Sequence, residues 1–225
     1  MDYNPVTCKT ALIFDFDGTI CGIFKNYDLK AVATDLAAGL QAMGLEFSGD
    51  QDAFDAFAEV QRQTAENPVL RKKALSFVHG VITQAEKEAV HTGVPIPGAL
   101  EILPGLVQKG YPLGIVTNNS EECVTDYLRK ELPGLMIPVI GRVWDAPEKM
   151  KPNPWLLETM LQLLHRTPQQ CIFIGDNPRD YACARAAGCP FIGIAPTEKK
   201  KKWFHELLPP EQIVGDFYAL DRMLP

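Results

Sequence analysis

Short apolar runs recur along the chain, and stretches with a helical spacing of apolar residues lie between them. The runs of strand length cover 11–14, 111–116, 137–140, 171–174 and 191–194, and the helical stretches lie near 98–109, 120–131, 154–165 and 178–187. Apolar strands separated by single helices are typical of parallel sheets whose right-handed crossovers place helices on both faces. The pattern therefore predicts an α/β fold with a Rossmann-like parallel sheet core and helices on both faces.

A different pattern occupies the segment from Lys25 to about Thr92. It is rich in Ala, Leu, Gln, Glu and Lys, and apolar residues such as Leu36 and Leu40 recur at helical spacing. We expect helices near 28–43, 50–65, 68–79 and 82–91, with breaks at Gly44, Asn67–Pro68 and Gly80, and with Asp50 and Asn67 as N-caps. The chain is therefore expected to divide into an α/β core of residues 1–22 and 95–225 and a small all-helical domain of residues 23–94.

Composition and charge narrow the range of partners. The chain has 225 residues, 46% of them hydrophobic, and a formal net charge of −6. A globular protein of this charge has no general attraction to nucleic acid or to an anionic membrane. No stretch approaches the roughly 20 apolar residues of a membrane span, and the first residues lack a signal-peptide pattern. We expect a cytoplasmic protein with no nucleic-acid and no membrane partner.

Several other residue types are interpreted as structural. The six cysteines form no C-x-x-C pair and mostly lie in apolar runs, which predicts buried thiols in a reducing compartment rather than a zinc site; they are Cys8, Cys21, Cys123, Cys171, Cys183 and Cys189. The histidines show no paired spacing, and they are His79, His91, His165 and His205. The run Lys199–Lys202 precedes an apolar helix and is interpreted as a solvated face.

The first apolar strand ends in two carboxylates, Asp15 and Asp17, followed by Gly18 and Thr19. Two acidic groups beside a buried strand repel each other and lose hydration, so a cation or hydrogen-bond donors must offset the cost. A simple Asx turn after the strand is the alternative. A calcium loop is excluded, because the next acidic position is missing and Asn26 stands where the closing glutamate belongs.

Polar residues also follow the other strands. Thr117-Asn118-Asn119-Ser120 comes after the second strand, Gly175-Asp176 and Asp180 come after the fourth, and Lys151-Pro152 introduces a helix. The carboxyl ends of parallel strands meet at one edge of the sheet, where ligands bind. Each residue has a simpler interpretation as well: Thr117 and Asn118 could cap a helix, Lys151 could be solvated, and Asp180 could pair with Arg179 or Arg185.

In this order and at these intervals, the residues resemble the four signatures of the haloacid dehalogenase superfamily. The signatures are Asp15-Phe16-Asp17-Gly18-Thr19, then Thr117-Asn118 after a strand, then Lys151-Pro152 before a helix, then Gly175-Asp176 with Asp180. The resemblance covers the core, and the helical segment matches a family cap inserted after the first strand. Asp17 favours a phosphatase or a phosphomutase, because dehalogenase and phosphonatase members lack a carboxylate at this position. Together with the cap, the resemblance is to the phosphoglycolate phosphatase-like branch.

The resemblance also implies roles for these residues. Asp15 is expected to be the nucleophile that forms an aspartyl-phosphate, and Asp17 the general acid and base. Asp15, Asp176 and the backbone carbonyl of Asp17 are expected to bind Mg²⁺, with Asp180 as support. Phosphoryl oxygens are expected to contact Thr117 and Asn118, and Lys151 is expected to neutralise charge. The expected substrate is a small phosphorylated metabolite.

Other functions on the same scaffold stay open. A phosphomutase would pass the phosphoryl group to another hydroxyl of a sugar phosphate, and a non-catalytic module would only bind phosphate or a partner. The substrate and the oligomeric state cannot be inferred from the sequence. The helical segment offers cations that could contact a second anionic group, namely Arg62, Arg71, Lys72 and Lys73.

Overall fold

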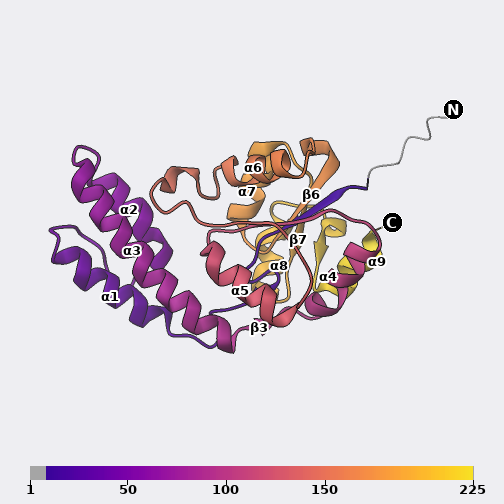
Figure 1. The fold of residues 1–225 in the computed structure, drawn as a ribbon, viewed down its shortest axis with the longest axis horizontal. Coiled ribbons are helices and arrows are strands. Elements are labelled where there is room, and N and C mark those ends of the chain that lie inside the picture. The colour runs from indigo at the N-terminus through magenta and orange to yellow at the C-terminus, as the bar shows by residue number, and fades with distance from the viewer. Residues whose placement is uncertain (1–8, 225) are drawn as a thin grey trace.

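A parallel sheet forms the centre of the protein, and a block of long helices extends from one end of it (Figure 1). The computed structural model describes residues 9–224. The sheet has six strands in the order β5-β4-β1-β6-β7-β8, all pairing in parallel. They are β1 (Ala11–Phe14), β4 (Leu113–Val116), β5 (Val139–Ile140), β6 (Cys171–Gly175), β7 (Phe191–Ile194) and β8 (Ile213–Val214). The predicted α/β fold is confirmed.

Helices cover both faces of this sheet. One face packs against α4 (Ala99–Gln108), α5 (Glu121–Glu131) and α9 (Phe217–Met223), and the other against α6 (Trp155–Leu163), α7 (Pro178–Ala187) and α8 (Glu198–His205). Successive residues of a strand face opposite sides. Leu12 and Phe14 accordingly belong to the first core cluster, and Ala11 and Ile13 to the second. β1 is thus buried on both sides, and its end can place polar groups only at the sheet's edge.

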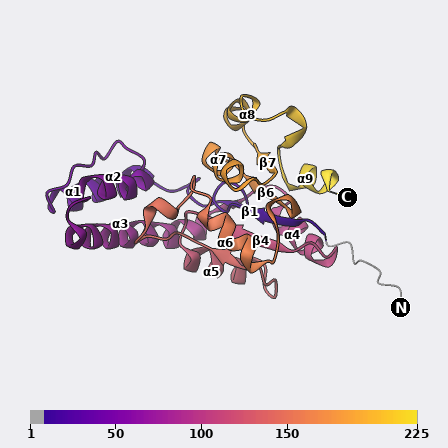
Figure 2. The ribbon, with the colours of Figure 1, turned by 90° about the horizontal axis from the view of Figure 1, so that it is seen from above.

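The helical block consists of α1 (Leu29–Gln41), α2 (Ala56–Gln63) and α3 (Pro68–Ala89). It has a hydrophobic cluster of its own, which includes Leu36, Phe57 and Val78. An antiparallel pair of short strands, β2 (Cys21–Gly22) and β3 (Val94–Pro95), joins the block to the sheet at both of its ends. Figure 2 shows α1, α2 and α3 extending together beyond the sheet. Short 3-10 helices complete the structure at Ala53–Asp55, Val90–Thr92, Pro147–Lys149, Pro168–Gln170 and Pro210–Gln212.

Two expectations for the helical block are wrong. α3 runs without a break through Gly80, because a helix-interior glycine costs only about 1 kcal/mol and the buried Val78 and Ile82 hold the helix on either side. Asp50 caps no helix; Asp52 instead accepts a hydrogen bond from the Phe54 N–H, before a short 3-10 turn. The predicted cap at Asn67 is confirmed, since its side chain accepts from the Leu70 N–H.

Two further sequence predictions concern the cysteines and membrane-spanning helices. All cysteines within residues 9–224 are buried and free, as predicted, and Cys8 lies outside the described residues. Within the same range, no helix has both the length and the apolar character needed to cross a membrane.

Gly80 offers a test of how α3 is stabilised. A methyl group added at this position would meet no heavy atom within 4 Å. Gly80→Ala is therefore expected to raise the free energy of unfolding by about 0.5–1 kcal/mol, because alanine reduces the freedom of the unfolded chain. Urea denaturation measures the change. Gly39→Ala is the matched control and should destabilise, since its methyl group would overlap the Phe77 ring; a loss of stability in Gly80→Ala would contradict this account.

Candidate active site

The loops that follow β1, β4 and β6 meet at one edge of the sheet and line a cavity of about 200 Å³. The structure brings every site residue expected from the sequence to this cavity: Asp15, Asp17, Thr117, Asn118, Lys151, Asp176 and Asp180. The strand order explains the meeting, because β1 lies between β4 and β6. The cavity also contains Asn119, Asn177 and Arg179, together with Phe24, Leu29, Asp52 and Phe54 from the helical block and its linker.

Lys151 joins two of the carboxylates. Its Nζ donates to Asp15 Oδ1 at 2.6 Å, to Asp180 Oδ1 at 2.7 Å and to the Val116 carbonyl at 3.1 Å. Burial alone would lower the pKa of this ammonium group, but the charges of Asp15 and Asp180 raise it above its ordinary value. Lys151 is therefore a buried cation, and its interpretation as a solvated lysine is wrong.

Both carboxylate oxygens of Asp180 accept hydrogen bonds from the protein. Its Oδ1 accepts from Lys151, and its Oδ2 accepts from the backbone N–H groups of Asp176 at 3.2 Å and Asn177 at 3.1 Å. Pairing of Asp180 with Arg179 or Arg185 on the helix surface is therefore wrong. Asp180 fixes the loop that carries Asp176, and it is 2% exposed.

Carboxylate oxygens of Asp15, Asp176 and Asp180 lie within 4.8 Å of one another and could hold a metal ion. Burial and the charge of Asp15 raise the pKa of Asp176 to about 7. Burial also raises the pKa of Asp180 to about 7, even though Lys151 opposes the shift. Oxygen ligands that are costly to ionise together fit a divalent cation, because its charge offsets their repulsion. Asp15 and Asp176 are the members with oxygens left for an ion.

Lys200 is a site residue that the sequence reasoning missed. It belongs to the run Lys199–Lys202, but its Nζ contacts Asp176 Oδ2, so the run is not simply a solvated face. Its neighbour Lys201 instead pairs with the exposed Glu198. Gly18 leaves the space for this contact, with φ at +81° and no room for a Cβ beside Asp176 and Lys200. No signal in the sequence separates Lys200 from the lysines around it.

Asp17 differs from the other carboxylates because no cation of residues 9–224 lies at hydrogen-bond distance from it. Its Oδ1 accepts from the Ile23 N–H at 2.9 Å. Burial raises its pKa to about 7, and the nearby charge of Asp15 adds to the shift. A carboxyl group with such a pKa exchanges a proton near neutral pH.

The loop after β4 is tied to the segment that carries Lys151. The Asn118 side chain donates to the Lys151 carbonyl and accepts from the Lys151 N–H, both at 3.0 Å. Thr117 Oγ1 donates to Asn119 Oδ1 at 2.8 Å. Neither Thr117 nor Asn118 caps α5, whose N-cap is Ser120 without a side-chain capping bond. The capping interpretation is therefore wrong.

The cations suggested in the helical block do not line this cavity. Arg62 pairs with Glu59, and Arg71 donates to the carbonyls of Thr64 and Ala65. Lys72 and Lys73 border a separate surface hollow. Arg179, at the start of α7, lines the cavity instead and pairs with Asp55 at 3.0 Å.

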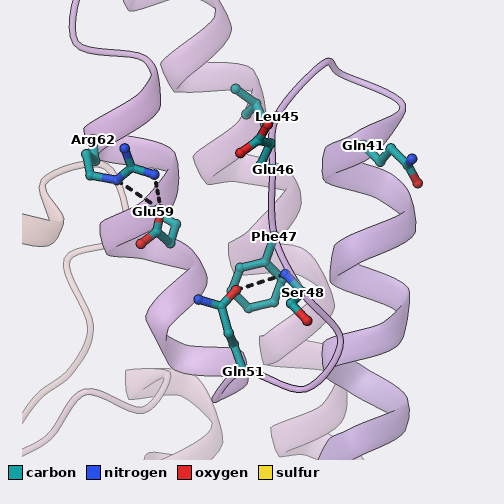
Figure 3. A pocket seen from close by; sticks show the side chains of 8 residues that line it. All are labelled: Gln41, Leu45, Glu46, Phe47, Ser48, Gln51, Glu59 and Arg62. Carbon is teal, nitrogen blue, oxygen red and sulfur yellow. Dashed lines mark hydrogen bonds and ion pairs between the residues drawn. The ribbon is translucent and has the colours of Figure 1, made fainter.

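A larger hollow of about 600 Å³ lies within the helical block and is shown in Figure 3. Its lining residues are Gln41, Leu45, Glu46, Phe47, Ser48, Gln51, Glu59 and Arg62. The arginine among them is engaged by Glu59 at 2.7 Å, and the lining holds no acidic cluster that could bind a metal. Size therefore does not identify the reactive site in this protein.

Comparison with known proteins shows which family the chain is similar to. A model of the family described as haloacid dehalogenase-like hydrolase matches residues 12–194. A phosphoglycolate phosphatase from Shigella sonnei is 35% identical over 206 residues, covering 80% of this chain and 79% of that protein. One from Rhodospirillum rubrum is 29% identical, with 81% and 78% covered.

Solved structures share the fold at low sequence identity. A hydrolase from Pseudomonas syringae aligns with a TM-score of 0.66 at 19% identity, covering 96% of this chain and all (100%) of that chain. A hydrolase of the same superfamily from Geobacter sulfurreducens aligns with a TM-score of 0.56 at 22% identity, covering 97% of both. These similarities establish the fold.

The contact of Lys200 with Asp176 predicts competition between this lysine and a metal ion. A divalent ion bound to Asp176 would share that carboxylate with the ammonium group, whose charge opposes the ion, so Lys200→Met is expected to tighten Mg²⁺ binding by about tenfold, the effect of removing one competing charge-assisted hydrogen bond. Isothermal titration calorimetry measures this affinity. Lys201→Met is the matched control and should leave it unchanged. Unchanged or weaker binding in Lys200→Met would show that the lysine does not compete.

Proposed function

Since the chain belongs to the haloacid dehalogenase-like hydrolases, we propose that it hydrolyses a small phosphomonoester with Mg²⁺ through an aspartyl-phosphate on Asp15. It is a phosphatase, as its relatives are named. The observation that carries the mechanism is the placement of Asp15, whose carboxylate lies at the buried end of the central strand and receives a 2.6 Å hydrogen bond from Lys151. We also propose that residues 23–94 form a cap domain, called the helical cap below.

The reaction needs charge neutralisation before a carboxylate can attack a phosphate ester. Asp15, Asp176 and the backbone carbonyl of Asp17 would hold Mg²⁺, which when bound screens the charges of the nucleophile and the phosphoryl group. Lys151 supplies a second, permanent positive charge 2.6 Å from Asp15 Oδ1. Thr117 and Asn118 would orient the phosphoryl oxygens.

The chemical steps follow from the positions of Asp15 and Asp17. An Asp15 oxygen forms a bond to phosphorus, the phosphorus–ester oxygen bond breaks, and protonated Asp17 gives its proton to the departing alkoxide. A water molecule then attacks phosphorus and gives a proton to Asp17, and the bond to Asp15 breaks to release inorganic phosphate. The raised pKa of Asp17 supports this exchange, because burial keeps a proton available near pH 7.

Phosphoglycolate is the first substrate to test, because the relatives with that name cover most of the chain. A cavity of about 200 Å³ suits a substrate of this size. Arg179 lines the cavity and would exchange Asp55 for the substrate carboxylate. Release of free phosphate, rather than isomerisation of a sugar phosphate, separates hydrolysis from a mutase reaction.

Asp15→Asn is expected to lower kcat for an aryl phosphate such as p-nitrophenyl phosphate by more than about a thousandfold, because the amide is not a nucleophile. A colorimetric assay of the released phenolate measures it. Asp35→Asn, an exposed aspartate on α1, is the matched control and should retain full activity. Retained turnover in Asp15→Asn would exclude Asp15 as the nucleophile.

Removal of divalent metal is expected to stop turnover and leave the protein folded. Without the cation, the carboxylates of Asp15 and Asp176 face each other, and within residues 9–224 Lys151 and Lys200 are their cationic partners. Activity after dialysis against EDTA, and after Mg²⁺ is returned, checks this, with circular dichroism as the control for folding. Full activity in EDTA would contradict a metal-dependent mechanism.

A further inference from the structure

A buried ion pair outside the proposed chemistry connects the helical cap to the core. Glu86 lies on α3, and Arg142 follows β5. We propose that Glu86 and Arg142 are positioning residues: they hold the loop 117–120 in the conformation that binds phosphoryl oxygens, so that phosphate binding depends on helix α3 of the cap. This inference rests on the proposed function of that loop.

The ion pair between Glu86 and Arg142 is bidentate and inaccessible to solvent. Arg142 Nη1 lies 2.9 Å from Glu86 Oε1, and Nη2 lies 3.0 Å from Oε2. Both side chains are 0% exposed. The removal of either partner would leave an uncompensated charge in the interior, which is strongly destabilising. A buried pair of this kind contributes little net stability compared with apolar side chains, so its position beside the phosphate-binding loop suggests a role in specifying the geometry there.

Glu86 and Arg142 hydrogen-bond to three successive residues of the loop, Asn118, Asn119 and Ser120. The Glu86 carboxylate accepts from the Asn119 side chain at 3.0 Å and from the Ser120 N–H at 3.1 Å. Arg142 Nη1 donates to the Asn118 carbonyl at 3.0 Å, and the Arg142 backbone N–H donates to the Asn119 carbonyl at 2.9 Å. The backbone on both sides of the Asn118–Asn119 peptide is therefore fixed by Arg142 and Glu86.

Glu86 also affects Thr117 indirectly, because it orients the side-chain amide of Asn119. Because Asn119 Nδ2 donates to Glu86, its Oδ1 is turned toward Thr117, from which it accepts a hydrogen bond at 2.8 Å. The Asn119 N–H also donates to Thr117 Oγ1, at 3.2 Å. Loss of the Glu86 carboxylate would free the Asn119 amide to turn over, and the hydroxyl of Thr117 would lose its fixed direction.

Arg142 is bound along successive turns of α3. Besides Glu86, its Nη2 donates to Thr83 Oγ1 at 2.9 Å, and its Nε donates to His79 Nδ1 at 3.3 Å. Burial, with the charge of Arg142, lowers the pKa of His79 to about 4, which keeps the ring neutral and its nitrogen able to accept. The same helix carries Val78 and Ile82 of the cap's hydrophobic cluster. Helix α3 therefore both contributes to the hydrophobic core of the cap and, through Glu86, contacts the phosphate-binding loop.

The test compares variants that differ in whether they touch this network. Glu86→Gln keeps the shape of the side chain, and the double variant Glu86→Gln/Arg142→Met removes both charges, so that no unpaired charge opposes folding. Both are expected to raise KM for p-nitrophenyl phosphate, and Ki for inorganic phosphate as a competitive inhibitor, by about tenfold or more, with a smaller change in kcat. Arg142→Lys keeps the positive charge but lacks the planar guanidinium group. It is expected to raise KM and Ki less than the double variant does.

Two controls separate positioning from stability. Lys87→Met removes an exposed pair between α3 and Glu122 of α5, one residue from Glu86. Val78→Ala removes buried volume from the same helix and lowers the urea midpoint without touching the loop. Both should leave KM and Ki unchanged for the folded protein. The inference is overturned if the Glu86 and Arg142 variants, folded by circular dichroism, keep KM and Ki within twofold of wild type, or if Val78→Ala raises both as much as they do.

Failure of the proposed function has a different signature. In that case the wild-type protein itself neither turns over aryl phosphate nor binds inorganic phosphate by calorimetry. Failure of the positioning inference instead leaves wild-type turnover and phosphate inhibition intact and appears only in the comparison of variants.

Discussion

The ammonium group of Lys151, held between Asp15 and Asp180, is the interaction on which the arrangement of the site depends. Asp15 follows β1, and Asp180 lies in the first turn of α7, which follows the neighbouring strand β6. Buried acids so close would repel each other without a cation between them. The backbone of Lys151 is in turn fixed by both polar atoms of the Asn118 side chain. The segments after β1, β4 and β6 therefore meet around one lysine.

One lysine does not neutralise the cluster. The carboxylates of Asp15, Asp17, Asp176 and Asp180 outnumber the ammonium groups of Lys151 and Lys200, and the pKa values of Asp17, Asp176 and Asp180 are raised to about 7 by burial. The residual negative charge makes the site receptive to a divalent cation. It also gives the carboxyl group of Asp17 a proton that it can donate near neutral pH.

The sequence predicted the parallel sheet well, because apolar strands with helices between them leave little choice of topology. It also predicted which polar residues would meet, since β1, β4 and β6 are neighbours and an acid or an amide follows each within two residues. It failed for Gly80, because packing around Val78 and Ile82 outweighs one weak helix former. It missed Lys200, Glu86 and Arg142, because nothing local distinguishes an engaged charge from a solvated one. Their roles arise from tertiary contacts alone.

The central claim is that Asp15 carries the phosphoryl group during turnover. The most direct measurement is mass spectrometry of the protein quenched with acid during hydrolysis of p-nitrophenyl phosphate in the presence of Mg²⁺. The account predicts the mass of one added phosphoryl group, located in the peptide that contains Asp15 and removed by hydroxylamine, which cleaves acyl phosphates. Steady turnover with phosphate found on a different residue, or with unmodified Asp15 under conditions that trap acyl phosphates, would contradict it.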